Sequence, residues 1–322
     1  MSFSMNNMAA KIVEEQILPD LDSLQCDAVR LENGATVVDM GIRTKGGWRA
    51  AKLFTDTCVG AMGEMTYDAM RIGTVLAPSV AIYVDRPCVA QLGSHDAGLY
   101  VPYRGRRQGV SGPLRSLNGA DPWARKIDYR DTGAKKAVGH LQTEEFPTAE
   151  LAGIIADTVG IAPENLYLLA ARTGTLVGAV QVCARNIEQT FATIGDRDFN
   201  IGAIVHASGY SPVISIVDDE NIAYGRVNDC LIYGQESNLY MDCEDVDITR
   251  FLEELPFAKN NDVFGTSFEE LFAQSEYDWA KVRREWDAPC KVNFINLRTG
   301  RFFQTGMIHY GVLERSFWGR ID

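Results

Sequence analysis

An arginine and a glutamate separated by two residues form the pair in this chain that is best suited to chemistry. They are Arg185 and Glu188, at the end of the stretch PENLYLLAARTGTLVGAVQVCARNIEQ that begins at Pro163. In a helix this spacing places both side chains on one face, where the guanidinium favours the ionised form of the carboxylate. A positioned, ionised carboxylate can take a proton from water. The spacing is equally typical of a surface ion pair, and the pair alone favours that simpler interpretation.

A basic, glycine-containing run and an asparagine beside an aspartate are the next candidates. The run RGRRQGVSGPLR, from Arg104 to Arg115, could cradle a phosphate through its backbone N–H groups, or it could be a solvated loop. It is not a P-loop, because no GKS or GKT follows. Asn228 and Asp229 precede an apolar run and could bind a polar substrate edge, although their spacing favours a turn.

The histidines and cysteines give no sign of a metal site or a disulfide framework. The four histidines are isolated, and the seven cysteines are scattered without a CxxC spacing, so reduced thiols are expected. His95 beside Asp96 could act as a general base, but a structural or surface role is the expected one. The chain also lacks GxGxxG after a strand and GxSxG, which leaves a Rossmann dehydrogenase and an α/β-hydrolase without support.

Length and charge limit the class of protein. The chain has 322 residues, of which 46% are hydrophobic, enough for one large or two medium domains with a core. Its net charge of -12 argues against nucleic acid as a partner. No apolar run approaches eighteen residues, and the first residues lack a basic segment followed by a long apolar one. We therefore expect no membrane association and a cytoplasmic location.

Helical and strand patterns alternate along the chain, which predicts an α/β class with mixed sheets. Apolar spacing predicts helices over residues 6–18, 48–62, 148–159, 176–194, 246–254 and 267–274. Short apolar runs predict strands over residues 26–31, 35–40, 79–85, 136–142, 165–170, 230–233, 238–241 and 291–297. The residues 32–34, Glu-Asn-Gly, indicate a hairpin between the first two strands. Glu188 lies four residues after Ala184 and therefore borders the buried side of its helix.

No linker divides the sequence, so domain boundaries rest on the order of elements alone. We expect a two-domain subunit, with an N-terminal α/β domain over residues 1–150 and a C-terminal α/β domain over residues 151–322. The domains could also be discontinuous.

Several segments together resemble the methenyltetrahydromethanopterin cyclohydrolase family, in an order and spacing that cover nearly the whole chain. The matching segments are LENGATVVDMG at Leu31, KLFTDTCVG at Lys52, LAPSVAIYVD at Leu76, QLGSHDAG at Gln91, SGPLR at Ser111, PENLYLLAARTGTLVGAVQVCARNIE at Pro163, GRVNDCLIYG at Gly225 and NLRTGRFFQTG at Asn296. The family's arginine and glutamate fall on Arg185 and Glu188. The resemblance thus points to the same pair as the residue spacing does.

The resemblance implies reversible hydrolysis of the methenyl bridge on tetrahydromethanopterin to the N5-formyl form, a step of one-carbon metabolism. It implies a tetrahydromethanopterin derivative as substrate, no permanently bound metal or prosthetic group, a cleft between two domains for the pterin, and a homotrimer. Glu188 would be the base that takes a proton from water, and Arg185 would orient it and keep its pKa low. Other residues would bind the pterin or its phosphate-bearing tail, or shape the wall near the central helix: Ser111, Gly112, Arg115, Asn228 and Asp229 for binding, and Thr175 and Gly178 for the wall.

The chain departs from the family pattern at several places. The residues before Ser111 are more basic than usual, and Leu99 stands where the family has an aromatic residue. Three further segments differ in polarity or charge: residues 255–258 (LPFA), 280–283 (AKVR) and 286–289 (WDAP). The alternative function is therefore a catalytically altered paralogue, which binds a pterin one-carbon carrier or a partner enzyme without turnover. A pocket filled by Phe257 and Trp286 would favour that alternative.

Overall fold

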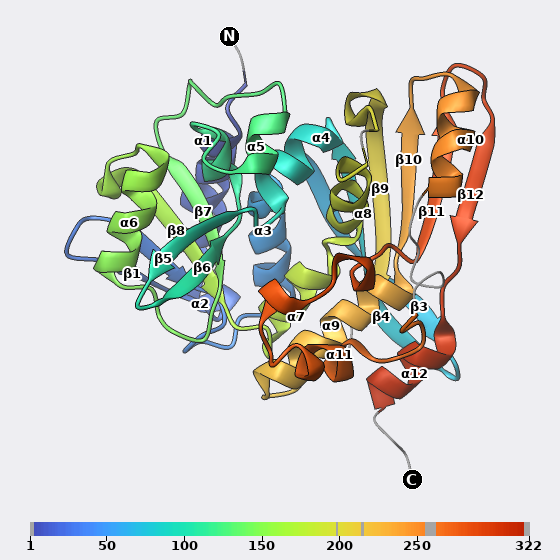
Figure 1. Cartoon of the computed structure of the whole chain (residues 1–322). Helices are drawn as coiled ribbons and strands as arrows, with labels where there is room; N and C mark the ends of the chain where they lie inside the picture. Colours follow the sequence, from blue (N-terminus) through green and yellow to red (C-terminus); the bar gives the residue numbers. More distant parts are fainter. Residues whose placement is uncertain (1–2, 198, 214–215, 255–261, 319–322) are drawn as a thin grey trace. The chain divides into compact units, whose positions relative to one another are not determined.

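The computed structural model describes residues 3–197, 199–213, 216–254 and 262–318 and shows a mixed α/β fold, which confirms the expected class (Figure 1). The strands are β1 (Asp27–Arg30), β2 (Thr36–Asp39), β3 (Gly63–Ile72), β4 (Val75–Asp85), β5 (Leu99–Tyr103), β6 (Arg106–Val110), β7 (Ala137–Gln142), β8 (Leu166–Ala171), β9 (Ile204–Pro212), β10 (Glu236–Met241), β11 (Lys291–Asn296) and β12 (Phe302–Gly306).

The α-helices vary from one turn to four turns in length. They are α1 (Met5–Ile12), α2 (Leu21–Leu24), α3 (Trp48–Cys58), α4 (Pro87–Ala90), α5 (Pro122–Lys126), α6 (Ala149–Val159), α7 (Leu176–Cys183), α8 (Asn186–Gly195), α9 (Glu220–Gly234), α10 (Asp245–Glu254), α11 (Phe268–Gln274) and α12 (Tyr310–Trp318). Within the described ranges, no helix has both the length and the apolar character needed to cross a membrane.

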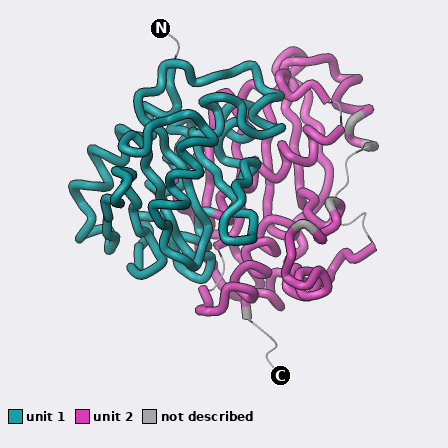
Figure 2. The backbone as a smooth tube through the Cα atoms, turned by 60° about the vertical axis from the view of Figure 1, so that its left-hand side comes forward, with its two compact units in different colours: residues 1–64, 88–181 teal, residues 65–87, 182–322 magenta. Residues whose placement is uncertain are grey.

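The contacts between residues divide the chain into two compact units (Figure 2). Unit 1 comprises residues 1–64 and 88–181, and unit 2 comprises residues 65–87 and 182–322. Residues 151–181 pack with the first unit in this grouping. The sequence predicts instead a domain boundary after residue 150, and that boundary stays a prediction.

Unit 1 contains a four-stranded sheet in the order β1-β2-β8-β7 and the separate hairpin β5-β6. Strands β7 and β8 are parallel and almost completely buried, without alternation, as expected for strands that are covered on both faces. The hairpin and helix α6 contribute to the same apolar core as the sheet. This core includes Val37, Leu99, Val101, Val110, Leu114, Leu141, Leu151, Ile155 and Leu168.

Unit 2 contains a six-stranded sheet in the order β12-β11-β10-β9-β4-β3. Strands β10 and β11 are parallel, whereas β9 is antiparallel to both of its neighbours. Buried and partly buried residues alternate along β10, so one face of this strand packs inward. Helices α8 and α9 both pack against β9, and α11 and α12 pack against α9.

Most of the predicted elements are confirmed, with ends that differ by a few residues. They include the helices α1, α3, α6, α10 and α11, the β1-β2 hairpin and the strands β4, β7, β8, β10 and β11. Among the predicted helices and strands, two are wrong. The helix over 176–194 is broken at residues 184–185, and residues 230–233 form no strand but the last part of helix α9. Helix α9 packs against β9 and against two helices, so apolar residues lie on several of its sides. Its apolar run therefore has the same sequence pattern as a buried strand.

One buried carboxylate links α9 to two neighbouring helices through hydrogen bonds. Asp229 is 1% exposed, and its Oδ1 accepts a hydrogen bond from the N–H of Phe268 (2.8 Å), the first residue of α11. Its Oδ2 accepts a hydrogen bond from the hydroxyl of Ser316 (2.8 Å) in α12. Burial raises the pKa of the Asp229 carboxyl to about 7, although the two hydrogen bonds oppose this shift. Asp229 therefore links three helices, and its ionisation in this buried position is energetically unfavourable.

The raised pKa of Asp229 predicts a pH-dependent effect of Asp229→Asn on stability. Between about pH 4 and the folded pKa of about 7, the folded protein retains a proton that the unfolded chain loses, so Asp229 makes stability fall as pH rises. An asparagine does not titrate. The stability of the variant relative to wild type should therefore increase from pH 4 to pH 7 by on the order of a few kcal/mol and then level off. Urea midpoints at several pH values test this, and a difference independent of pH would contradict it.

Candidate active site

A break between two helices sets the position of the arginine and glutamate. Helix α7 ends at Cys183 and α8 begins at Asn186, and Arg185 is the N-terminal cap residue of α8. The N–H of Arg185 donates to the carbonyl of Val182 (2.9 Å), and its carbonyl accepts from the N–H of Gln189 (3.0 Å). Glu188 consequently lies in the first turn of α8, where the exposed N–H groups of a helix favour a negative charge.

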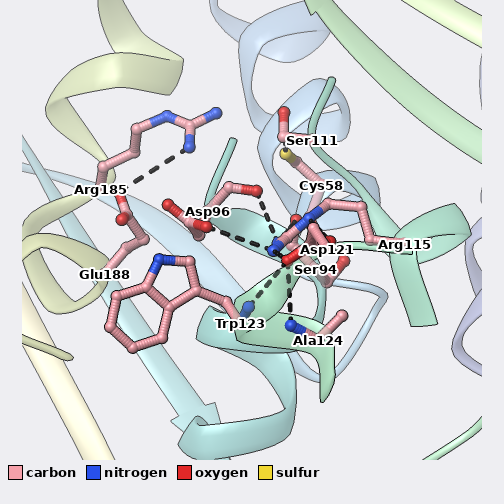
Figure 3. Close-up of polar contacts among 10 residues, drawn as sticks. All are labelled: Cys58, Ser94, Asp96, Ser111, Arg115, Asp121, Trp123, Ala124, Arg185 and Glu188. Carbon is pink, nitrogen blue, oxygen red and sulfur yellow. Dashed lines mark hydrogen bonds and ion pairs between the residues drawn. The ribbon is translucent and has the colours of Figure 1, made fainter. Parts of the chain in front are cut away.

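The two side chains face each other within unit 2 (Figure 3). Nη1 of Arg185 lies 3.8 Å from Oε2 of Glu188, and each side chain is only 12% exposed. A pair this well covered is screened by water much less than a surface ion pair. The pair is therefore not the surface ion pair that the spacing alone favoured. The prediction that Glu188 borders the buried side of its helix is confirmed.

Strand β9 holds both ends of the helix break. The hydroxyl of Ser211 in β9 donates to the carbonyl of Cys183 and accepts from the side-chain amide of Asn186 (3.2 Å), the first residue of α8. The carbonyl of Asn186 accepts from the hydroxyl of Ser237 in β10 (2.8 Å). These three residues are buried, so the turn that carries Glu188 is fixed on the six-stranded sheet.

A segment that departs from the family pattern also contacts this turn. The side-chain amide of Gln189 donates to Oδ1 of Asp287, and Gln189 is 3% exposed. Trp286 is buried, with the Arg283 guanidinium 5.3 Å from the centre of its ring. The segment at 286–289 (WDAP) therefore holds Gln189, the residue that follows Glu188, through a hydrogen bond. The sequence alone did not predict this contact. Phe257 and the rest of the segment 255–258 lie outside the described residues.

In unit 1, Ser111 and Gly112 lie where strand β6 meets the four-stranded sheet. The backbone of Ser111 pairs with that of His140 in β7, and its hydroxyl accepts from the thiol of Cys58 (3.6 Å). Gly112 has φ +101°, and a Cβ there would lie 2.5 Å from Nδ1 of His140 and 2.9 Å from the carbonyl of Val138. Only glycine fits this position, which gives a structural reason for the SGP sequence.

Arg115 lies at the centre of a buried ion cluster (Figure 3). Its Nε and Nη2 donate to the two carboxylate oxygens of Asp121 (2.9 and 2.7 Å), and Nη2 also donates to Oδ2 of Asp96 (3.2 Å). Its Nη1 donates to the carbonyls of Asp96 (2.7 Å) and Ser94 (3.4 Å). The Arg115 side chain is fully buried, and these bonds use all five of its N–H groups. The structure thus shows Arg115 joining three segments of unit 1, and its substrate-binding role stays a prediction.

The acidic partners of Arg115 were not assigned a role from the sequence. Asp121 caps helix α5 by accepting from the N–H groups of Trp123 and Ala124 (3.0 Å each), and the order Asp-Pro is a known signal for a helix start. His95, considered as a base, is fully buried with its Nδ1 3.1 Å from Oε1 of Gln91, which favours the structural interpretation.

Thr175 and Gly178 are brought together at the start of α7. The hydroxyl oxygen of Thr175 accepts from the N–H of Gly178 (3.3 Å), as a helix cap does, and donates to the carbonyl of Arg172 (2.8 Å). A Cβ on Gly178 would lie 1.7 Å from that same carbonyl. Both residues therefore have structural reasons to be present, and their contact with a substrate stays a prediction.

Asn228 and Asp229 lie inside helix α9, so the predicted turn at this place is wrong. The side-chain amide of Asn228 donates to the carbonyl of Tyr224 one turn earlier (2.8 Å), and Asn228 is 5% exposed. Asp229 has both oxygens engaged by the neighbouring helices. Among the described residues, no group of three or more His, Cys, Asp and Glu side chains is placed to hold a metal ion.

Comparison with known proteins agrees with the family resemblance seen in the sequence, over almost the full length of the chain. Residues 4–317 match the family model described as Cyclohydrolase (MCH). The chain is 31% identical to the methenyltetrahydromethanopterin cyclohydrolase of Methanocaldococcus jannaschii over 318 residues, or 97% of this chain and 98% of that protein. It is 29% identical to the protein of that name from Methanothermobacter thermautotrophicus, with 97% and 98% covered, and 31% identical to that from Methanococcus maripaludis strain C7, with 96% and 97% covered. The chain therefore belongs to the methenyltetrahydromethanopterin cyclohydrolase family.

Proposed function

We propose that this protein hydrolyses 5,10-methenyltetrahydromethanopterin reversibly to N5-formyltetrahydromethanopterin. The observation that carries the proposal is the largely covered pair of Arg185 and Glu188, fixed at the N-terminus of α8, in a chain that matches known cyclohydrolases over 97% of its length. The methenyl carbon belongs to a delocalised amidinium cation and is already electrophilic. The enzyme's main task is therefore to deliver water and to move protons.

Glu188 takes a proton from the water molecule as the oxygen attacks the methenyl carbon. The product of this step is a neutral carbinolamine, and the proton resides on the Glu188 carboxyl. Glu188 then returns a proton to N10 as the C–N10 bond breaks, while the hydroxyl group loses its proton and becomes the formyl carbonyl. Overall, one cation and one water give the formyl compound and one released proton, so atoms and charge balance.

Arg185 orients the carboxylate of Glu188 and favours its ionised form before water attacks. The negative charge of Glu188 also attracts the cationic substrate. Ser111, Gly112, Arg115, Asn228 and Asp229 belong to the proposal as binding residues, with Thr175 and Gly178 as wall residues. Because Arg115 and Asp229 are engaged inside the protein, we propose that they act by holding neighbouring groups in place. Assembly as a homotrimer stays a prediction from the resemblance.

The function is tested by the near-UV absorbance of methenyltetrahydromethanopterin. With purified wild-type protein, the band of the conjugated amidinium should disappear much faster than in buffer, and the rate should be proportional to protein concentration. Heat-denatured protein at the same concentration is the control. Tight binding of the substrate by calorimetry without catalysed loss would contradict the proposal and would identify a carrier-binding paralogue.

Substitution of Arg185 tests its assigned role. In Arg185→Ala the carboxylate loses its guanidinium neighbour, so we expect kcat to fall by about tenfold to a hundredfold, while Arg185→Lys keeps the charge and retains part of the activity. Arg197→Ala, at an exposed position two residues past the end of the same helix, is the matched control and should behave as wild type. Steady-state kcat and KM provide the measurement. Equal kcat in wild type and Arg185→Ala would show that Arg185 has no part in the reaction.

A further inference from the structure

The segment that leads into strand β11 is anchored on both sides of Asp287. It begins with a single 3-10 turn, Arg284–Trp286, in which Trp286 is 8% exposed. It ends at Cys290, whose thiol donates to the carbonyl of Met307 (2.8 Å) and whose carbonyl accepts from the N–H of Met307 (3.0 Å). Asp287 lies between these anchors, so its carboxylate has a defined position within unit 2.

Asp287 contacts the first turn of α8 through one side chain, that of Gln189. The N–H of Gln189 donates to the carbonyl of Arg185 (3.0 Å), so Gln189 lies one turn after Arg185 and beside it on the helix surface. The side-chain amide of Gln189 donates to Oδ1 of Asp287, and Gln189 is 3% exposed. Among the described residues this is the only hydrogen bond of the Gln189 side chain, since its Oε1 is buried without a partner.

The six-stranded sheet holds the other side of the same turn. The hydroxyl of Ser237 donates to the carbonyl of Asn186 (2.8 Å) and lies 3.0 Å from the hydroxyl of Thr190. Asn186 and Thr190 lie on one side of α8, and Gln189 lies between that side and the arginine and glutamate pair. The sheet therefore fixes the side of the helix that faces it, whereas Asp287 fixes the side next to the pair.

A carboxylate is well suited to hold the amide of Gln189. It only accepts hydrogen bonds, so it turns the NH₂ group of the amide toward itself and excludes the reversed orientation. A hydrogen bond to an ionised acceptor is also stronger than one between neutral groups. Without Asp287 a buried amide would lose its partner, and other orientations of the turn would become accessible. Residues 286–289 depart from the family pattern, so this support is a property of this chain.

We propose that Asp287 is a positioning residue of the cyclohydrolase reaction, which restrains the first turn of α8 through Gln189 and so sets the direction of the Glu188 carboxylate. The inference rests on the proposed function, in which Glu188 takes a proton from water. A base must be aligned with the attacking water, so a small reorientation lowers the rate of the chemical step more than the affinity for substrate. Loss of Asp287 therefore lowers kcat and leaves KM nearly unchanged.

Steady-state kcat and KM for methenyltetrahydromethanopterin test the proposal, at a temperature at which urea unfolding shows each variant to be folded. We expect Asp287→Ala to lower kcat about tenfold, with KM within about twofold of wild type. Asp287→Asn keeps an oxygen that can accept from Gln189 and should regain most of the lost activity. Glu285→Ala removes an exposed carboxylate from the same segment and is the matched control, which should behave as wild type.

The partner side chain provides a second, independent variant. Gln189→Met keeps the length of the side chain but removes the amide, so it should lower kcat as much as Asp287→Ala does. The double variant Gln189→Met/Asp287→Ala should be no slower than either single variant, because both substitutions remove one contact. Gln189→Met also decides the outcome if Asp287→Ala does not fold.

An unchanged kcat in Asp287→Ala or in Gln189→Met, even with lowered stability, would overturn the proposal, because the contact would then be structural only. The proposal would also be overturned if Asp287→Asn were as slow as Asp287→Ala, or if the two losses multiplied in the double variant. If wild type hydrolyses the substrate and one of these results is found, only the positioning role fails. If wild type does not hydrolyse the substrate, the cyclohydrolase function fails and the positioning role fails with it.

Discussion

The hydroxyl group of Ser211 spans the helix break that places Glu188, and the geometry of the candidate site depends on this contact. It donates to the last carbonyl of α7 and accepts from the first side chain of α8, so a single buried group of β9 fixes both ends of the break. Had the chain continued as one helix, Arg185 would be a mid-helix residue and Glu188 would lose its place in a first turn. A buried hydrogen-bond network is costly to leave unsatisfied, which makes this arrangement specific.

A different physical constraint organises the candidate residues of unit 1. Arg115 is a fully buried cation, and such a charge is tolerated only when carboxylates and carbonyls surround it. Asp121, Asp96 and the Ser94 carbonyl satisfy this requirement, and they belong to two other segments of the sequence. Removal of one member of such a cluster costs about 3–5 kcal/mol, because a charge is left buried without its partner. Two family segments, QLGSHDAG and SGPLR, are thereby joined by one guanidinium.

Local patterns in the sequence predicted most elements, because buried strands such as β7 and amphipathic helices such as α6 follow their own periodicity. They failed where tertiary contacts decide the outcome. The run Cys230–Tyr233 is apolar because α9 packs on several elements, and the break before Asn186 depends on Ser211, which lies far along the chain. For the site, the spacing of Arg185 and Glu188 was visible in the sequence, but their low exposure and the support from Asp287 were not.

The central claim is that Glu188 acts in the chemical step. Its most direct test is a single-turnover measurement with Glu188→Gln in excess over methenyltetrahydromethanopterin, in which the absorbance of bound substrate is followed with time. Because an amide cannot take a proton from water, we expect the variant to bind the substrate and to convert it at least about a hundredfold more slowly than wild type. Conversion of the bound substrate at the wild-type rate would contradict the account.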